Sequence, residues 1–259
     1  MVARLVGAES GEVNRRHGGR MSAHHMHYGG PVTTVYAPHS WPDFGRVVRL
    51  PGVYAPQADS RFLAGALGRE DVTGRDVLDL CSGSGVLAAH AARLGARVSA
   101  VDISRRAVLT VRLNALLARQ RVSVHRGDLM SALPGRTFDL IVSNPPYVPA
   151  PHAALPGRGR ARAWDAGVDG RALLDRICRL APRALRPGGA LLLVHSATSG
   201  AETTVRRLTE AGMRAGVSDR VRIPLGPVMR ERLDWLRERG LLAPGQDTEE
   251  LVIVRAVKH

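Results

Sequence analysis

Four consecutive residues, Asn144 to Tyr147, have the types best suited to chemistry in this chain. They read Asn-Pro-Pro-Tyr and follow an apolar run, 138–143, that predicts a buried strand. The Asn144 side-chain oxygen and the Pro145 carbonyl are two neighbouring hydrogen-bond acceptors. Pro145 and Pro146 stiffen the turn, so we expect these acceptors to be preorganised. Tyr147 adds a flat ring on which a planar substrate group can stack.

This tetrapeptide suits the methylation of a planar amide or exocyclic amino nitrogen. The lone pair of such a nitrogen is delocalised into its π system, which makes it a poor nucleophile. Two acceptors on its N–H groups would orient it and oppose that delocalisation as the methyl group arrives. No strong general base is needed if the proton leaves after transfer. The four residues leave open whether the nitrogen belongs to a protein, a nucleobase or a metabolite.

A second motif, at residues 79–85, reads Asp-Leu-Cys-Ser-Gly-Ser-Gly and predicts a nucleotide site. Gly83 and Gly85 let the backbone pass close to a ligand, and the helix that follows offers free N–H groups. Asp102 ends the next predicted strand, where a carboxylate can accept hydrogen bonds from both hydroxyls of a ribose. Asp128 follows the third predicted strand and can lie beside an adenine.

The glycine loop alone also matches the dinucleotide fingerprint, Gly83-x-Gly85-x-x-Ala88 with a later acidic residue. Two carboxylates favour a methyl donor instead. Asp79 precedes the loop, where it would repel a pyrophosphate and would suit the cationic amino and sulfonium end of S-adenosylmethionine. Asp128 adds an acceptor for the adenine amino group. We therefore expect S-adenosylmethionine as the cofactor, and no bound metal.

Strands and helices alternate along the part of the chain that would position these motifs. Apolar runs predict strands at 77–80, 97–101, 122–125, 138–143 and 190–194. Amphipathic segments predict helices at 58–67, 84–94, 104–119, 169–185 and 200–212. Ser104 is expected to cap its helix, and the Arg-Pro-Gly-Gly run at 186–189 to stop the helix before it.

This alternation predicts an α/β fold with a Rossmann-like, doubly wound sheet of about seven strands, mostly parallel. Residues 214–222 and 250–257 are the last two predicted strands, with a helical insert near 227–239 between them. If the two strands pair as a hairpin, the sheet ends with an antiparallel C-terminal strand.

The composition fits one folded domain with extra segments, since the chain has 259 residues and is 44% hydrophobic. We predict a flexible leader at 1–45, rich in Gly, His and Arg, and a methyltransferase domain at 46–259. The leader histidines would bind a metal only as an alternative to this flexible role; they are His17, His24, His25 and His27.

Two features of the composition indicate a cytoplasmic protein without membrane contact. No apolar run approaches the roughly 18 residues of a membrane helix, and the charged N-terminus does not suit a signal peptide. Cys81 and Cys178 are the two cysteines, which suits a reducing compartment and predicts no disulfide.

The chain carries a formal charge of +14, and Lys258 is its single lysine. A positive field would favour RNA, DNA or a ribosome-associated protein as partner. A GC-rich coding sequence also produces arginine together with abundant Ala, Gly and Pro. The charge is therefore weak evidence for a nucleic-acid or ribosome-associated partner. The arginine-rich loop at 156–162 would either grip RNA or an acidic substrate, or form a solvated lid.

With these motifs the sequence resembles the HemK-like protein N5-glutamine methyltransferases, which modify a glutamine in translation release factors. The resemblance covers residues 50–200, and the matching segments are 79–85, Asp102, 127–129, 143–148 and the Gly-Val-Asp-Gly run at 167–170. The short branch, which lacks the separate N-terminal helical domain, is the most similar.

The leader motif of that branch is matched by residues 53–60. It implies Tyr54 and Ser60 as cofactor contacts, with Asp59 ranked after them. Ser60 stands where the family has threonine and keeps the hydroxyl. Further residues are expected to lie beside the cofactor: Cys81, Ile103, Leu129 and Asn144.

The resemblance implies a protein substrate similar to a release factor, and in eukaryotes and archaea the short branch works with a small zinc-binding partner protein. Three alternatives stay open. One is a nucleic-acid methyltransferase acting on adenine N6 or a guanine amine, for which a target-recognition domain is missing. The others are a small-molecule N-methyltransferase and a non-catalytic cofactor-binding subunit.

Overall fold

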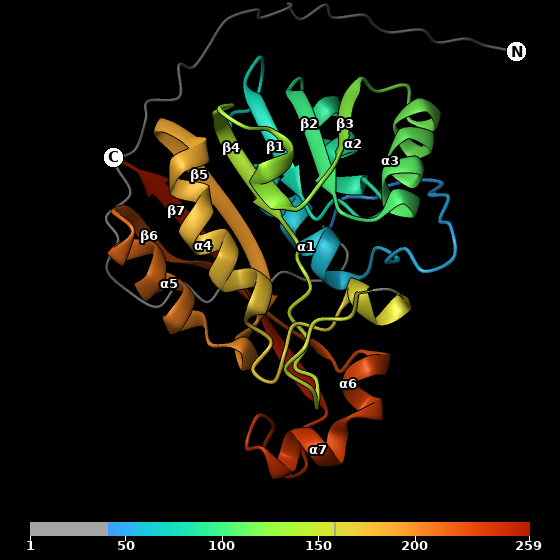
Figure 1. Cartoon of the computed structure of the whole chain (residues 1–259), viewed down its shortest axis with the longest axis vertical. Helices are drawn as coiled ribbons and strands as arrows, with labels where there is room; N and C mark the ends of the chain where they lie inside the picture. Colours follow the sequence, from blue (N-terminus) through green and yellow to red (C-terminus); the bar gives the residue numbers. More distant parts are fainter. Residues whose placement is uncertain (1–40, 158) are drawn as a thin grey trace, which may run out of the picture. The chain divides into compact units, whose positions relative to one another are not determined.

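The structure is a computed structural model that describes residues 41–157 and 159–259. The histidine-rich part of the predicted leader lies outside these residues. The described chain is built on one sheet with the strand order β3-β2-β1-β4-β5-β7-β6 (Figure 1). Its strands are β1 (Asp76–Leu80), β2 (Arg97–Asp102), β3 (Val122–Arg126), β4 (Phe138–Ser143), β5 (Leu185–Ser196), β6 (Met213–Pro224) and β7 (Thr248–Lys258).

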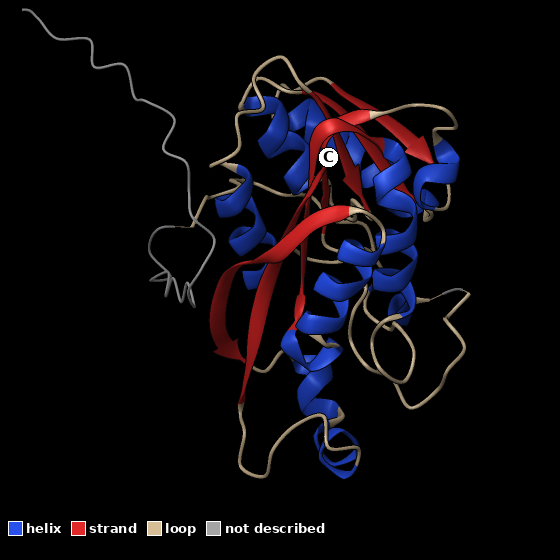
Figure 2. Ribbon diagram, turned by 90° about the vertical axis from the view of Figure 1, so that its left-hand side faces the viewer, coloured by secondary structure: helices blue, strands red, loops and turns tan. Residues whose placement is uncertain are grey.

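Helices cover both faces of this sheet (Figure 2). They are α1 (Ala58–Leu67), α2 (Val86–Arg93), α3 (Arg105–Leu117), α4 (Ala172–Ala184), α5 (Ala201–Glu210), α6 (Pro227–Glu231) and α7 (Leu233–Glu238). The first three pack in sequence against one another, whereas α4 and α5 pair and lie in front of β5 to β7 in Figure 1. The predicted doubly wound α/β architecture is confirmed.

Burial on both faces explains why the central strands read as apolar runs. Leu78, Leu80, Ile141 and Leu192 are all at most 1% exposed and belong to one continuous core. The predicted cap of α3 is also present, because Ser104 Oγ accepts a hydrogen bond from Ala107 N at 3.4 Å.

Two helices begin two or three residues later than predicted, in each case because of a glycine in the left-handed region. Gly85 has a φ of +79°, so α2 begins at Val86 instead of residue 84. Gly170 has a φ of +71°, so α4 begins at Ala172 instead of residue 169. In both cases the turn that precedes the helix is a site loop.

The C-terminal hairpin forms as predicted, but its strands lie in an unexpected order. β7 is antiparallel to both β5 and β6 and lies between them, so β6 is the outermost strand. The predicted antiparallel C-terminal strand is therefore confirmed, and it lies inside the sheet instead of at its edge. The helical insert consists of the short helices α6 and α7, at the foot of Figure 1.

The predicted stop signal at 186–189 does end α4, but it is not a separate turn. β5 already begins at Leu185, and the register against β4 shifts between Phe138 and Leu140. None of the helices in the described part of the chain has the length and apolarity needed to cross a membrane.

Candidate active site

A cavity of about 360 Å³ lies beyond the carboxyl ends of β1, β2 and β4. Open parallel sheets bind ligands at this edge, because the loops that follow neighbouring strands converge there. Most of the residues expected at the site line this cavity: Tyr54, Ser60, Cys81, Gly83, Asp102, Ile103, Asp128, Leu129, Asn144, Pro145, Pro146 and Tyr147. Asp79 and Gly85 are the expected residues that do not line it.

Asp102 is fixed by two backbone amides at the end of β2. Its Oδ2 accepts from Gly83 N at 2.9 Å, and its Oδ1 accepts from Ser104 N at 2.8 Å. Burial raises the pKa of this carboxyl, and the hydrogen bonds from the backbone oppose that rise. Each oxygen keeps a second lone pair, so the carboxylate fits the two hydroxyls of a ribose.

Asp79 lies beneath the glycine loop and is fully buried. Its Oδ2 accepts from Ala88 N at 3.1 Å, which ties β1 to the first turn of α2. Its Oδ1 has no hydrogen-bond partner among the described residues, and burial raises the pKa of the carboxyl to about 7. Asp79 is therefore not an exposed carboxylate, although the sequence predicted that it faces the cationic end of the cofactor. One buried acceptor is left without a partner among the described residues, and Asp79 itself does not line the cavity.

Gly85 is required by packing and does not approach the ligand cavity. A Cβ at this position would lie 2.8 Å from Val111 Cγ1 on α3, and its φ of +79° favours glycine. Gly83 does line the cavity, where a Cβ would make only ordinary contact with Tyr54. The sequence could not separate these two roles, because both glycines belong to one motif.

Asp128 carries an ion pair that the sequence did not reveal. Arg176 Nη2, on α4, lies 2.6 Å from Asp128 Oδ2, and both residues line the cavity. The two residues are far apart in sequence, so no local pattern indicates the contact. An ion pair between partly exposed side chains contributes about 0–1 kcal/mol, so Asp128 can still accept a hydrogen bond from a ligand.

Asn144 is oriented by the leader motif. Its Nδ2 donates to Ser60 Oγ at 3.3 Å, and Ser60 in turn donates to Asp59 Oδ1 from its N (2.6 Å) and its Oγ (3.2 Å). Because the amide nitrogen is engaged in this way, the Asn144 oxygen is left as the acceptor. Asn144 and Ser60 both line the cavity.

Asp59 joins the two tyrosines of the site. Tyr54 Oη donates to Asp59 Oδ2 at 2.8 Å, and Tyr147 Oη donates to the same oxygen at 3.3 Å. Burial and the charge of Asp59 raise the pKa of both phenols well above the usual value. Both phenols therefore stay protonated donors, and Asp59 has a larger structural role than the sequence indicated.

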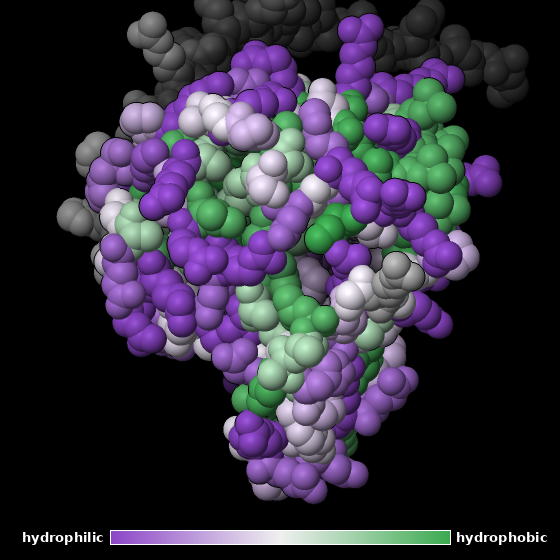
Figure 3. Space-filling view, viewed as in Figure 1, coloured by the Kyte–Doolittle hydropathy of each residue, from purple (hydrophilic) through white to green (hydrophobic). Residues whose placement is uncertain are grey.

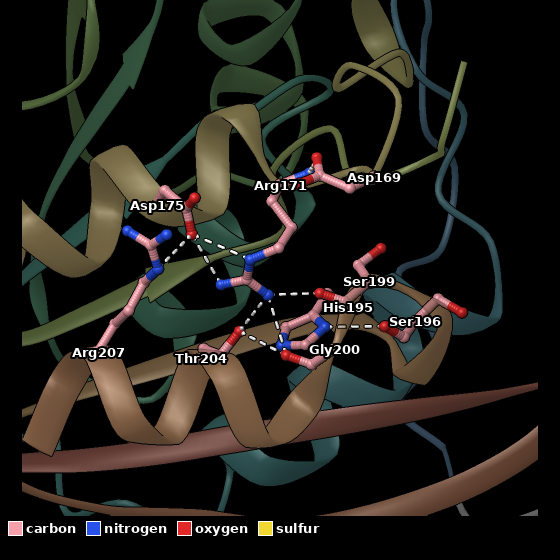
Figure 4. A network of polar contacts seen from close by, with 9 residues as sticks. All are labelled: Asp169, Arg171, Asp175, His195, Ser196, Ser199, Gly200, Thr204 and Arg207. Atoms are coloured by element: carbon pink, nitrogen blue, oxygen red, sulfur yellow. Dashed lines mark hydrogen bonds and ion pairs between the residues drawn. The ribbon is translucent and has the colours of Figure 1, made fainter. Parts of the chain in front are cut away.

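Ser199 joins the backbone of Tyr147 to an arginine network, and Figure 4 shows Ser199 and that network around Arg171. The Tyr147 carbonyl accepts from Ser199 Oγ at 2.8 Å. Arg171, at the N-cap of α4, donates to the Ser199 carbonyl, to Gly200 O (2.9 Å), to Thr204 Oγ1 (3.2 Å) and to Asp175 Oδ1 (2.8 Å). Sequence reasoning missed Arg171, although it directly follows the motif at 167–170.

The arginine-rich loop forms one wall of the cavity. Leu155, Pro156, Gly157, Gly159 and Arg162 line it, and a 3₁₀ turn spans Arg160–Ala163. Arg162 and Asp102 both line the cavity, and the positive charge of Arg162 opposes the rise in the pKa of Asp102 that burial causes. The next residues return to the tetrapeptide, because Val148 N donates to Trp164 O at 2.8 Å.

Comparison with known proteins identifies the domain. Residues 45–155 match the family model described as the methyltransferase small domain. A putative protein N5-glutamine methyltransferase of Methanocaldococcus jannaschii is 33% identical over 180 residues, which cover 69% of this chain and 90% of that protein.

Two bacterial relatives match over a shorter part of their length. A ribosomal protein uL3 glutamine methyltransferase of Bradyrhizobium diazoefficiens is 48% identical over 45% of this chain, and a release factor glutamine methyltransferase of Streptomyces coelicolor is 35% identical over 59%. This chain spans 39% and 58% of the lengths of those proteins.

Solved structures share the fold. A T. thermophilus 16S rRNA methyltransferase in complex with AdoMet and guanosine superimposes with a TM-score of 0.52 and 23% identity, over 82% of this chain and 46% of that one. A chain of the E. cuniculi Mtq2–Trm112 complex, described as methylating the termination factor eRF1, gives a TM-score of 0.54 and 23% identity, over 80% and 99%.

The fold and the matched domain define an S-adenosylmethionine-dependent methyltransferase. Within that class the chain belongs to the family of protein N5-glutamine methyltransferases, the HemK-like family.

Proposed function

We propose that this enzyme methylates the side-chain amide nitrogen of a glutamine in a protein, either a translation release factor or a ribosomal protein. The observation that carries the proposal is the orientation of Asn144, whose Nδ2 is engaged by Ser60 Oγ while its oxygen is left to accept. The names of the bacterial relatives support a glutamine acceptor in these two protein classes.

The proposed mechanism depends on orienting a weak nucleophile. Asn144 Oδ1 and the Pro145 carbonyl each accept one N–H of the acceptor amide, which turns the nitrogen lone pair towards the cofactor cavity. Bound S-adenosylmethionine supplies an electrophilic methyl group. Tyr147 presents its ring to the planar amide, and its hydroxyl stays bound to Asp59. The amide proton leaves after transfer, so no side chain acts as a strong base.

The cofactor residues bind different parts of S-adenosylmethionine in this proposal. Asp102 binds the ribose hydroxyls, and Asp128 and Leu129 lie against the adenine. Tyr54, Ser60, Cys81, Ile103 and Gly83 form the remaining wall of the cavity. The unpartnered Asp79 Oδ1 fits the amino group of the methionine moiety, which would supply the missing donor.

The experiment is a transfer assay with labelled S-adenosylmethionine on separated protein, RNA, DNA and metabolite fractions. Label is expected in the protein fraction. Asn144→Ala is expected to lower the rate by about 10²–10³ because it removes one preorganised acceptor, while cofactor affinity is nearly unchanged. Full activity of Asn144→Ala would refute the mechanism. Label in another fraction alone would refute the substrate class.

We also propose that a small activating partner protein covers α3. Leu109, Leu116 and Leu117 on this helix are 57%, 73% and 53% exposed, and apolar residues gather over this region in Figure 3. An apolar patch of this kind on a charged surface is typical of a protein interface. Co-purification of the wild type with such a partner, and its loss in Leu116→Asp, would support this.

A further inference from the structure

A second cavity, which we call the acceptor groove, adjoins the cofactor cavity and has a volume of about 1260 Å³. Tyr54, Asp59 and Tyr147 line both cavities, so these side chains form the partition between them. Asn144 and Pro145 line the cofactor cavity and not the groove, so an acceptor amide held by a chain in the groove would reach them past this partition. Much of the rest of the lining of the groove comes from the end of β6, the start of β7 and the insert, and the segment before α1 also contributes.

The insert is braced against the chain that directly follows the tetrapeptide. Arg232 Nη1 donates to Pro149 O at 2.9 Å, and its Nη2 lies 2.7 Å from the buried Asp165 Oδ1. The insert also has a small apolar core of its own, against which Val148 packs: Leu225, Met229, Leu236 and Leu242. This wall of the groove is therefore fixed relative to Asn144–Tyr147.

Glu249, on β7, is an unexplained buried carboxylate in the groove. The residue is 6% exposed, and its Oε2 has no hydrogen-bond partner among the described residues. Burial raises the pKa of the carboxyl to about 6; the Ser196 hydroxyl opposes the rise, and the charge of Asp59 adds to it. Its own charge in turn helps to raise the pKa values of Tyr54 and Tyr147.

A buried acceptor without a hydrogen bond costs free energy. We therefore expect a donor group of a ligand to bind Glu249 Oε2. The lining of the groove decides what kind of ligand that is. Asp59 and Glu249 are buried carboxylates that would repel a phosphate placed beside them, whereas Glu250 is paired with Arg220. Apolar contact comes from Trp41, Trp164 and the insert residues Leu225, Val228 and Met229.

The groove is also lined by five arginines, which are Arg49, Arg160, Arg220, Arg222 and Arg230. Arg222 and Arg230 line it and are exposed, which suits main-chain carbonyls or an acidic side chain. Buried carboxylates, apolar walls and exposed arginines together fit an extended polypeptide, which offers N–H donors, carbonyl acceptors and apolar side chains.

We propose that the acceptor groove binds the polypeptide segment that carries the methylated nitrogen, and that Glu249 Oε2 accepts a hydrogen bond from an N–H or O–H donor of that segment. The inference rests on the proposed function, since it assumes a protein acceptor. Glu249 is in this account a specificity-determining residue, and the insert is the wall that confines the segment.

The test compares the steady-state kinetics of Glu249→Gln and wild type on purified bacterial release factor and on ribosomal protein uL3. Glutamine keeps the shape of the side chain and removes the charge. We expect the KM for the protein to rise about tenfold or more, with kcat within about threefold and cofactor affinity unchanged. Glu238→Gln is the matched control, because Glu238 is exposed on α7 and does not line the groove.

A second variant keeps the test decisive if Glu249→Gln folds poorly. Val228→Arg changes a half-exposed residue of the insert wall, so the core is not disturbed. It is expected to raise the KM for the protein without affecting cofactor binding.

Unchanged KM values in both variants, with an active wild type, would overturn the groove inference and leave the glutamine function standing. A wild type that methylates RNA or a metabolite and no protein would overturn both. Parallel loss of cofactor affinity in Glu249→Gln would show a structural role and would also overturn the inference.

Discussion

Ser60 and Asp59 orient three side chains of the site, Tyr54, Tyr147 and Asn144. Asp59 holds the hydroxyls of Tyr54 and Tyr147, and Ser60 holds the Asn144 amide. The contacts of Tyr147 and Asn144 join the segment after β4 to the segment before β1, and the contact of Tyr54 lies within the segment before β1. The position of the acceptor pair therefore depends on residues that precede the first strand.

Ser60→Ala tests the role of the hydroxyl. Without Ser60 Oγ the Asn144 amide can rotate, so we expect kcat to fall about five- to tenfold, the value of one ordinary hydrogen bond. Ser60→Thr keeps the hydroxyl and should stay within about twofold of wild type. Steady-state methyl transfer at saturating cofactor measures both. Equal losses in the two variants would show that the hydroxyl is not what orients Asn144.

Asp79 makes the stability of the cofactor-free enzyme depend on pH. Burial raises the pKa of this carboxyl to about 7, from 3.8. The folded state therefore binds more protons than the unfolded state between these two pKa values. The contribution of this protonation to the free energy of unfolding is full below about pH 4 and is lost as the pH rises through about 7.

Asp79→Asn removes this titration and keeps an acceptor for Ala88 N. Between about pH 5 and about pH 8 the wild type should lose about 2–3 kcal/mol of unfolding free energy relative to the variant. Urea denaturation at the two pH values measures the difference. A pH-independent difference would mean that Asp79 stays ionised in the folded enzyme.

Much of the site was predictable at the residue scale, because its chemistry is written in contiguous motifs. Asn144, Asp102 and Gly83 lie where the motifs place them, beside one cavity. Arg176 and Glu249 were not predictable, because each reaches the site from a distant helix or strand. No local pattern distinguishes them from surface residues.

At the scale of elements, the turn before α4 fixes the backbone of the tetrapeptide. Gly170 is the last residue of the motif at 167–170, and a Cβ at this position would overlap Tyr147 O and would lie 2.7 Å from Ser199 Oγ. The left-handed φ of +71° and this close approach both exclude a side chain. The glycine motif therefore supports the active-site turn and need not touch the ligand itself.

Gly170→Ala should consequently damage both activity and folding. Its matched control is Gly188→Ala, since Gly188 has a similar φ of +75° but nothing within 4 Å of a Cβ. Both variants pay the same backbone strain of about 1 kcal/mol, and only the first displaces Tyr147. We expect at least about a tenfold larger loss of kcat for Gly170→Ala, with cofactor affinity less affected. Similar losses of kcat in the two variants would show that displacement of Tyr147 is not the cause.

Element positions were largely predictable, because each strand and helix has its own apolar period. α1 and β4 have the predicted bounds, and most other bounds differ by one to three residues. β5 is the larger departure, since it begins five residues before its prediction. The late starts of α2 and α4 come from glycine conformations, which depend on packing against Val111 and Tyr147.

At the scale of the whole molecule, strand order was the part that local sequence did not determine. Either strand of a β6–β7 hairpin can pair with β5. In this chain β7 does so, and this pairing joins residues that are far apart in the sequence. That pairing has a functional consequence. The start of β7, with Glu249, lines the acceptor groove, and β6 and the insert form its outer wall.

Two adjoining cavities define how the whole molecule would work. One has the carboxylates for a nucleoside, and the other has the walls for a polypeptide; Tyr54, Asp59 and Tyr147 lie between them. The central claim is that a polypeptide in the second cavity presents a glutamine amide to the cofactor at Asn144.

The most direct test is to incubate the purified enzyme with S-adenosylmethionine and either bacterial release factor or ribosomal protein uL3, and to locate the methyl group by tandem mass spectrometry. The account predicts one added methyl group on the side-chain nitrogen of a glutamine, absent with Asn144→Ala. A methyl group on another type of side chain, or transfer to RNA or to a free metabolite with none to protein, would contradict it.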